Sequence, residues 1–562
     1  MSHWQAFEPD SEFVRSQILR GCLDYVEVAS QVAETRFFEY VLRATPWEGL
    51  VRTFPSPRKK QEVPLWLYLS SQVSLRLHGL TGYGAYPYVI HAGGLSQVLG
   101  RDQAWWKQDS RTGSASLHFE GYNDKNTYER RTPCDPDYLR KMARSTDEAG
   151  LEHWFGAQVP RYLHAAGMWD QEGIVLVDGT YLFVPDNARY ENSSLMWFDE
   201  HNHPTDPPKT PQERQKVRLR RCYRAVQMLH TNRQRDWAVY TGLKMGSGAM
   251  AEAPCLGPMM ERLVGSLPTG AVKLVIHDRG FIDGKTMTHL KRDLGVDSLF
   301  PMRRDMLDWK DAQRLADLDG QPWQVYRPPA HQPPPVPAQR PAWLQTAEEK
   351  RQRTLKAQKA ERIREGKQKP PVTVDRVELK LIGKMRLWDA SDVPLSVVVM
   401  REYLTDGTCN IWGLGTTRED LTPLEVRDLY GVRTGIEEGH RQTKCFWDLT
   451  RFRSCDYGLV LAQVVFTLLA FTLMQMFLVK GDREEWSGRT RQRLWDSLLP
   501  AGEKILAYAG GRVAFLDAVT FAQWLVSVKD GARRRLSGRL RDLQRQKMAL
   551  PELPLRPTGF QP

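Results

Sequence analysis

The sequence feature that most constrains the fold is a long uncharged segment, GLVLAQVVFTLLAFTLMQMFLV, from Gly458 to Val479. A helix of this length can cross the apolar part of a membrane. The segment contains glutamines and threonines, however, and entirely apolar helices also occur in the cores of large soluble proteins. We therefore favour a buried helix that other elements surround on every side. A membrane span is the alternative, and it would make the protein fractionate with membranes.

The length and composition of the chain favour a large protein with an anionic partner. Its 562 residues, 41% of them hydrophobic, are enough to enclose a buried helix. Lysine and arginine number 79 against 67 aspartates and glutamates, which gives a net charge of +12. This excess favours a polyanionic partner. Nucleic acid is the first candidate, and an anionic membrane surface is the second.

The cysteines and the N-terminal segment indicate a reducing compartment. The seven cysteines are scattered and form no CxxC pair, which argues against a disulfide framework or a zinc ribbon. The segment MSHWQAFEPDSEF lacks the basic stretch and apolar run of a secretory signal. We expect a cytoplasmic protein.

Between residues 173 and 304 the pattern predicts strands that alternate with helices. GIVLVD (173–178) and AVKLVIHD (271–278) are apolar runs typical of buried strands. WAVYTGLKM and DSLFPMRR predict further strands, and GKTMTHLKRDLGV predicts a helix. This alternation indicates an α/β fold with a mixed sheet.

Two segments between these strands have more ambiguous patterns. TYLFV and SSLMWF are interpreted as a pair of neighbouring antiparallel strands. ERQKVRLRRCYRAVQML is interpreted as a basic helix.

An insertion from about residue 305 interrupts this pattern. Pro328 to Pro341 is rich in proline and cannot be helical, and Thr346 to Lys369 is strongly basic. The basic segment is either an exposed charged arm or a phosphate-binding surface. Three β-rich stretches follow it: VELKLIGKMRLW, LSVVVMREYL and CNIWGLGTT.

Both ends of the chain are predicted to be mainly helical. The N-terminal part contains amphipathic runs and is a candidate for general DNA contact. The C-terminal part ends in a basic segment from Lys529 to Lys547, which either contacts phosphates or is an ordinary solvated tail.

Two aspartates follow the apolar runs and are candidate functional residues. Asp178 ends GIVLV and Asp278 ends AVKLVIH, and strand ends in α/β sheets commonly present functional groups. A glycine follows each acid, in DGT and DRG, and we interpret it as a turn that leaves the carboxylate uncovered. Either aspartate alone is weak evidence, because many such residues only cap the next helix, and the pair is the stronger signal.

The stretch YGVRTGIEEGHRQTK is predicted to place four polar residues on one helix face: Tyr430, Arg433, Glu437 and Lys444. At about 100° per residue, all four fall within an arc of roughly 60°. Glu438 lies about 100° from Glu437, outside that arc. The stretch therefore predicts a single site that includes Glu437. The alternative is an exposed helix face in which Arg433 and Glu437 form an ordinary i,i+4 ion pair.

The pattern YxxRxxxExxxxxxK in this stretch resembles the signature of a large family of bacterial insertion-sequence transposases with a DDE active site. In two other places the chain resembles the same family. VLVDGT, which contains Asp178, is similar to the segment around the family's first aspartate, and residues Asp278 to Phe281 match the DRG-F/Y motif around its second. The three motifs occur in the family's order. The resemblance covers about residues 170 to 480, and it assigns no role to the proline-rich and basic segment of the insertion.

The resemblance implies an RNase H-like catalytic domain with a defined active site. Asp178, Asp278 and Glu437 would be catalytic and would hold two divalent ions, expected to be Mg²⁺ with Mn²⁺ as the alternative. Tyr430, Arg433 and Lys444 would bind DNA phosphates near the scissile bond.

We accordingly expect a DNA transposase that cleaves the ends of an insertion sequence and transfers them to target DNA by two-metal-ion phosphoryl transfer. Its partners would be double-stranded DNA and a second copy of the chain, as a homodimer in a synaptic complex, without a membrane. The alternative is a non-catalytic DNA-binding protein derived from a transposase.

These expectations divide the chain into five regions. They are a helical N-terminal region with a DNA-binding role (1–165), the first part of the RNase H-like domain (166–304), the insertion (305–418), the second part of the domain (419–480) and a helical basic C-terminal region (481–562).

Overall fold

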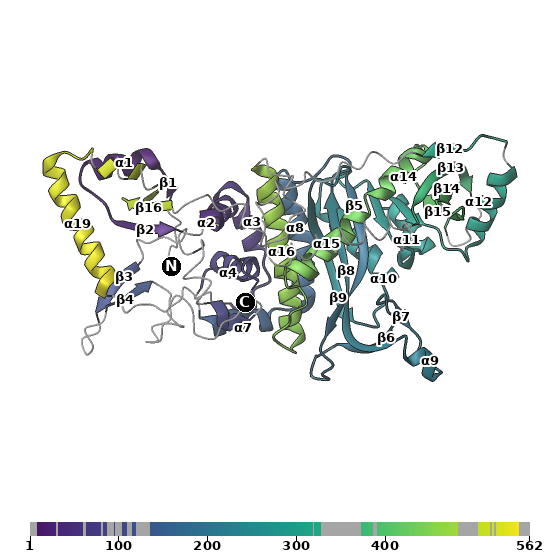
Figure 1. Cartoon of the computed structure of the whole chain (residues 1–562), viewed down its shortest axis with the longest axis horizontal. Helices are drawn as coiled ribbons and strands as arrows, with labels where there is room; N and C mark the ends of the chain where they lie inside the picture. Colours follow the sequence, from purple (N-terminus) through teal and green to yellow (C-terminus); the bar gives the residue numbers. More distant parts are fainter. Residues whose placement is uncertain are drawn as a thin grey trace, which may run out of the picture.

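The structure is a computed structural model, and its three main parts are arranged side by side along the longest axis (Figure 1). A small sheet with the basic helix α19 lies at one end, helices occupy the middle, and a large sheet extends to the other end. The structure describes residues 8–29, 32–59, 63–79, 82–86, 95, 104–108, 115–119, 135–318, 320–326, 372–385, 391–481, 504–517, 520–521, 524–525 and 527–549.

The centre of the large sheet has the strand order β9-β8-β5-β10-β11. The bounds of these strands are β5 Ile174–Val184, β8 Arg218–Thr231, β9 Ala238–Ser247, β10 Leu274–His277 and β11 Asp297–Pro301. β8 is antiparallel to β5 and β9, whereas β10 is parallel to β5 and β11. Helix α10 (Ala253–Ser266) connects β9 to β10, and α11 (Gly284–Arg292) connects β10 to β11. This arrangement is RNase H-like and confirms the predicted α/β fold class.

Two local predictions in this sheet are wrong. The expected basic helix is mostly strand β8, and only Pro211–Arg214 form a short helix, α9. β8 lies between β5 and β9, and consecutive side chains such as Met228 and Leu229 are both fully buried. A strand with two buried faces has no alternating pattern, so its periodicity cannot be separated from that of a buried helix.

The second wrong prediction concerns the strand after Asp178. Residues 180–184 continue β5 and do not form a separate strand. The neighbour expected for them, β6 (Ser194–Phe198), instead pairs with β8 and with the short strand β7 (Pro204–Thr205). Together with α9, β6 and β7 form an arm that projects from the large sheet (Figure 1).

The insertion extends the same large sheet. Its strands are β12 (Gln324–Tyr326), β13 (Val374–Met385), β14 (Leu395–Leu404) and β15 (Cys409–Thr416), and β15 pairs antiparallel with β11. Helix α12 (Leu307–Leu318) packs against β13 and β14. The three predicted β-rich stretches are thus confirmed as strands, and the described part of the sheet has 11 strands. The proline-rich segment 328–341 and the basic segment 346–369 lie outside the described residues.

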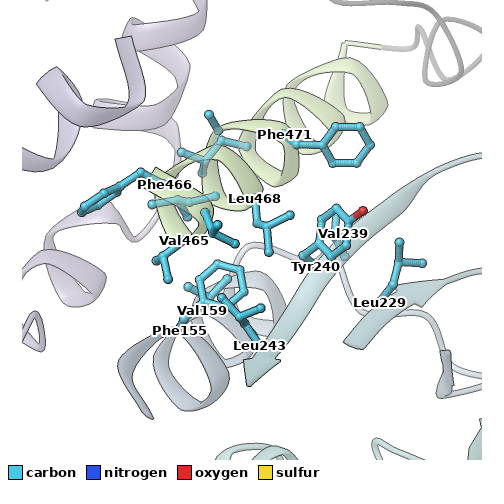
Figure 2. Close-up of a cluster of buried hydrophobic side chains, with 14 of the residues drawn as sticks. Phe155, Val159, Leu229, Val239, Tyr240, Leu243, Val465, Phe466, Leu468 and Phe471 are labelled. Carbon is cyan, nitrogen blue, oxygen red and sulfur yellow. The ribbon is translucent and has the colours of Figure 1, made fainter. Parts of the chain in front are cut away.

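The uncharged segment forms helix α16 (Tyr457–Lys480), which is buried as predicted. One side contacts β9, and other sides contact α4 (Leu65–Leu77), α7 (Pro136–Ser145) and α8 (Glu148–Ala165). Figure 2 shows α16 side chains, among them Phe466 and Leu468, close to side chains of α8 and β9. By length and composition α16 is the one helix in the described ranges that could cross a membrane, but its most apolar window is completely buried.

The polar side chains of α16 have specific partners in this core. The Thr472 hydroxyl accepts a hydrogen bond from the backbone N–H of Tyr240 on β9 at 2.9 Å. The Thr467 hydroxyl donates to the Gln463 carbonyl oxygen at 2.7 Å. Buried polar groups cost little only when they are hydrogen-bonded. The Thr472 bond links α16 to β9, whereas the Thr467 bond satisfies its hydroxyl within the helix.

The helices expected in both terminal regions are present, but each region also contains strands. The N-terminal elements include α1 (Ser11–Leu19), α2 (Val32–Glu39), η1 (Tyr40–Ala44), α3 (Trp47–Arg52), η2 (Tyr83–Ala85), β1 (Glu8–Pro9), β2 (Tyr25–Ala29), β3 (Ala104–Gln108) and β4 (Ala115–Phe119). The C-terminal elements are β16 (Lys504–Ala509), β17 (Arg512–Asp517) and α19 (Asp530–Ala549). Strands from both ends form one sheet in the order β1-β17-β16-β2.

Replacing Phe466 by alanine should destabilise the protein strongly. The ring is fully buried and packs within 6.3 Å of the Phe54 ring and 6.0 Å of the Tyr68 ring, measured between centroids. The cavity should lower the free energy of unfolding by about 3 to 5 kcal/mol. Chemical denaturation measures this change, with Leu318→Ala as the control because Leu318 is 81% exposed. Equal stability of the two variants would contradict the buried position of α16.

Candidate active site

Asp178 lies in the middle of β5, and not at its end as the sequence suggested. Its strand continues for several residues, and the Gly179 N–H donates to the Asp178 carboxylate at 3.0 Å. Gly179 is therefore a strand residue, so the interpretation of DGT as a turn is wrong. The neighbouring strand β10 stops at His277, which pairs with Val177, so Asp178 lies one residue beyond the last β5–β10 pair, with its side chain 16% exposed.

Asp278 follows the last residue of β10, as predicted. It precedes a single 3₁₀ turn, η5 (Arg279–Phe281), and its carboxylate accepts a hydrogen bond from the Arg279 N–H at 2.7 Å. His277 pairs with Val177, so Asp278, just after β10, lies at the same level as Asp178 on the adjacent strand β5.

The stretch from Tyr430 to Lys444 forms two helices and not one. Helix α14 (Pro423–Gly431) ends before Arg433, and α15 (Thr434–Phe446) begins after it. Hydrogen bonds between residues three apart, such as Arg433 N–H to the Tyr430 carbonyl at 3.0 Å, tighten the connection. The polar residues nevertheless face the same region, because the connecting residues keep helical backbone angles.

Two glycines let α15 approach the sheet closely. A methyl group on Gly439 would lie 2.9 Å from the Tyr240 hydroxyl and 3.0 Å from the Leu229 side chain. Gly435, one turn earlier, faces Leu176 on β5 at 3.4 Å. The backbone of α15 therefore lies directly on β5, β8 and β9, and this contact brings Glu437 toward the aspartates.

Arg433 connects the three predicted catalytic acids. Its Nη2 lies 3.6 Å from Oδ1 of Asp178 and 3.7 Å from Oδ2 of Asp278, and its Nη1 donates to Oε1 of Glu437 at 2.5 Å. The Arg433 side chain is only 14% exposed. The three acids, though distant in the sequence, thus share one cationic partner.

The charges of this group support one another. Burial acts to raise the pKa of Asp178, but His440 and Arg433 outweigh it and hold that pKa below its usual value. Burial acts to lower the pKa of Arg433, but the surrounding carboxylates raise it overall. Asp178 is therefore ionised and Arg433 protonated at neutral pH.

The two adjacent glutamates have different partners. Glu437 faces Arg433, whereas Glu438 accepts hydrogen bonds from Arg441 at 2.5 and 2.6 Å and from Gln442 at 2.7 Å. Glu438 is thus occupied on another side of α15. This difference agrees with the helix phase predicted for the two residues, and the catalytic assignment of Glu437 stays a prediction.

Lys444 and Tyr430 border the acids. The Lys444 ammonium donates to the Thr180 hydroxyl on β5, and burial lowers the pKa of Lys444 to about 8, although Asp178 opposes that effect. The Tyr430 ring lies 6.0 Å from the Trp412 ring, and burial raises the pKa of its phenol. Both side chains are half-buried, so only part of each is open to a ligand.

Sequence reasoning missed three residues beside this group. Nε2 of His440 lies 3.5 Å from Oδ2 of Asp178, and helix phase could have found it, because it follows Glu437 by one turn. Glu252, just before α10, forms an ion pair with Arg224 on β8. Burial raises the pKa of Glu252, an effect that Arg224 opposes and that Asp178 and Asp278 reinforce. No local pattern marks Glu252 or Arg224.

The donor types of the acids suit a hard divalent cation, because such ions prefer carboxylate oxygens. A positive charge, the Arg433 guanidinium, already lies where the three carboxylates converge. As the side chains lie, no group of three or more His, Cys, Asp or Glu residues in the described ranges could hold an ion. The three acids therefore have the donor atoms that a divalent ion prefers, and they converge on one point. In this structure the Arg433 guanidinium occupies that point.

An RNase H-like sheet that presents acidic residues from neighbouring strands and a nearby helix is typical of the nucleic-acid-processing enzymes with this fold. The family model described as "Transposase DDE domain" matches residues 170–473, which is more than half of the chain. The chain therefore belongs to the transposase DDE domain family, and its function is of the transposase type, in DNA transposition and recombination. None of the curated proteins matches the chain.

Replacing Gly439 by alanine should loosen α15 from the sheet. The added methyl group would press on Tyr240 and Leu229, both fully buried, and such overpacking typically costs about 1 to 3 kcal/mol. Gly431→Ala is the matched control, because a methyl group there meets nothing within 4 Å. Thermal or chemical unfolding should show a loss of stability only for Gly439→Ala. A stabilised Gly439→Ala would contradict the close contact.

Proposed function

We propose that this protein is a DNA transposase that cleaves the ends of its element and joins them to target DNA, with Asp178, Asp278 and Glu437 as the catalytic acids. The observation that carries the proposal is the convergence of these three carboxylates on one cation, the Arg433 guanidinium. Such mutual proximity of like charges is unfavourable unless a cation compensates it.

Asp178, Asp278 and Glu437 would hold two divalent ions, expected to be Mg²⁺. When bound, such ions activate a water or 3′-hydroxyl nucleophile and stabilise the leaving oxygen in an in-line displacement at phosphorus. The protein's own contribution is to hold the carboxylates ionised and correctly placed. Asp178 meets this requirement, since its pKa lies below the usual value.

Arg433 would change partners during binding. Its guanidinium now contacts the acids, and the same donors suit a phosphate oxygen pair. Once other cations compensate the carboxylates, Arg433 becomes available to a DNA phosphate beside them. Lys444 and Tyr430 would add a point charge and a hydroxyl donor on either side.

Double-stranded DNA is the proposed substrate, and its contacts would extend beyond the catalytic group. The net charge of +12 favours a polyanion, and the terminal regions are the proposed sites of further contact. A homodimer is proposed because two element ends must be held together for transfer. We also propose that the protein acts in the cytoplasm.

The active-site assignment predicts a large loss of cleavage in Asp178→Asn, Asp278→Asn and Glu437→Gln. Each substitution should reduce Mg²⁺-dependent cleavage by more than the ten- to hundredfold typical of losing an outer partner of a metal ligand. The measurement is cleavage and strand transfer of a plasmid that carries the gene with its flanking DNA.

Glu438→Gln is the matched control for this prediction. It changes the neighbouring glutamate in the same way but removes only contacts with Arg441 and Gln442, so cleavage should remain near wild type. Wild-type activity in any of the three acid variants would refute the assignment. A complete absence of metal-dependent nicking by the unmodified protein, with DNA binding intact, would instead favour the non-catalytic DNA-binding alternative.

DNA binding should weaken between pH 7 and pH 9 because of Lys444. Its pKa is lowered to about 8, so its ammonium is charged below that pH and neutral above it. If Lys444 binds a phosphate, the slope of log affinity against log salt concentration should become shallower by about one as the pH rises. Fluorescence anisotropy with end-containing DNA measures both quantities.

Lys444→Arg provides the comparison, because arginine stays charged throughout this pH range. This variant should retain DNA affinity at pH 9 better than the unmodified protein does. Identical pH profiles for the two proteins would show that Lys444 does not contribute a phosphate contact.

A further inference from the structure

A fourth carboxylate, that of Glu252, touches the backbone beside both catalytic aspartates. A methyl group placed on Gly179 would overlap the Glu252 carboxylate, and one placed on Gly280 would lie 2.6 Å from its Oε2. Gly179 directly follows Asp178, and Gly280 is two residues after Asp278. One carboxylate thus fills the space against both acid-bearing segments.

These contacts give a reason other than a turn for the presence of glycine in DGT and DRG. Neither glycine has the positive φ that would require glycine for conformational reasons. What both positions require is room, because any side chain would displace Glu252. The two short motifs and Glu252 therefore form one packing unit, although Glu252 is far from both in the sequence.

Arg224 on β8 holds Glu252 in this position. Its Nε donates to Oε1 of Glu252 at 2.7 Å, and its Nη2 donates to the same oxygen. Arg224 also lies over the Tyr181 ring, 4.9 Å from its centroid, and donates to the Met250 carbonyl at 3.4 Å. The Arg224 and Glu252 side chains are only 21% and 13% exposed, so the pair is rigid and shielded from solvent.

We propose that Glu252, fixed by Arg224, is a positioning residue that sets the separation of Asp178 and Asp278 for binding divalent ions. This inference rests on the proposed function. Glu252 acts through the backbone of its neighbours, since one carboxylate oxygen is taken by Arg224 and the other lies against Gly280. Its pairing with Arg224 also adds no net charge next to the acids.

The experiment measures Mn²⁺ affinity of the full-length, DNA-free protein by electron paramagnetic resonance. Glu252→Gln keeps the shape but loses the ion pair, and it should weaken Mn²⁺ binding by about ten- to hundredfold. The number of binding sites per folded molecule should stay the same, whereas a merely structural role would lower that number and leave the affinity unchanged. Wild-type affinity would overturn the proposal.

Gly179→Ala tests the same contact from the other side. The methyl group should displace Glu252 and weaken Mn²⁺ binding, but Gly179→Ala should add little further loss when combined with Glu252→Ala. Fully additive losses would show that the two residues act independently and would overturn the proposal. If Glu252→Gln does not fold, Gly280→Ala provides a second test, because its methyl group would press on Oε2 of Glu252. Wild-type Mn²⁺ affinity in Gly280→Ala would also overturn the proposal.

Two controls separate this inference from the proposed function. Glu261→Gln, on helix α10, which begins directly after Glu252, but paired with His289, should leave Mn²⁺ affinity unchanged. Asp178→Asn should abolish Mn²⁺ binding if the proposed acids hold the ions. Retained binding in Asp178→Asn refutes the proposed site itself, whereas its loss together with wild-type affinity in Glu252→Gln refutes only the role of Glu252.

Discussion

The burial of α16 is the interaction on which the rest of the structure depends. A helix that is apolar on every side is stable in water only when other elements cover all of it. Here β9 covers one side and helices of the N-terminal region cover the others (Figure 1). β9 pairs with β8, and β8 pairs with β5, which carries Asp178. Trp447, at the end of α15, packs on Phe471 of α16, so the same core also orients the helix that carries Glu437.

Around this apolar core the active-site region is organised by charge compensation. Three carboxylates meet at Arg433, and a fourth, Glu252, is paired with Arg224. Without these arginines the acids would repel one another and would be costly to bury. The two arginines differ in their freedom, however. Arg224 is tied to Glu252, a ring and a backbone carbonyl, whereas the ion-pair partners of Arg433 are three carboxylates that a bound cation would also satisfy.

The parts of the fold that could be predicted from sequence are those with a strong local pattern. The apolar runs at β5 and β10, the strands of the insertion and the buried helix all have such patterns, and the three predicted acids lie together in the structure. The failures have physical causes. Asp178 lies inside a strand because β5 goes on pairing with β8 beyond the end of β10, and pattern alone cannot show where each neighbouring strand stops. Glu252 and Arg224 meet only through the tertiary fold.

The shared terminal sheet has a consequence for the order in which the protein folds. Residues 25–29 pair with residues 504–508, so the pairing of β2 with β16 must wait until residue 508 has been synthesised. During translation β1 and β2 emerge first. The RNase H-like sheet and α16 follow, and they can assemble before β16 and β17 are available to pair with β1 and β2. Contacts between such distant segments form slowly, because a very long loop must close. The sheet of β1, β17, β16 and β2 is therefore expected to form after the RNase H-like sheet and α16.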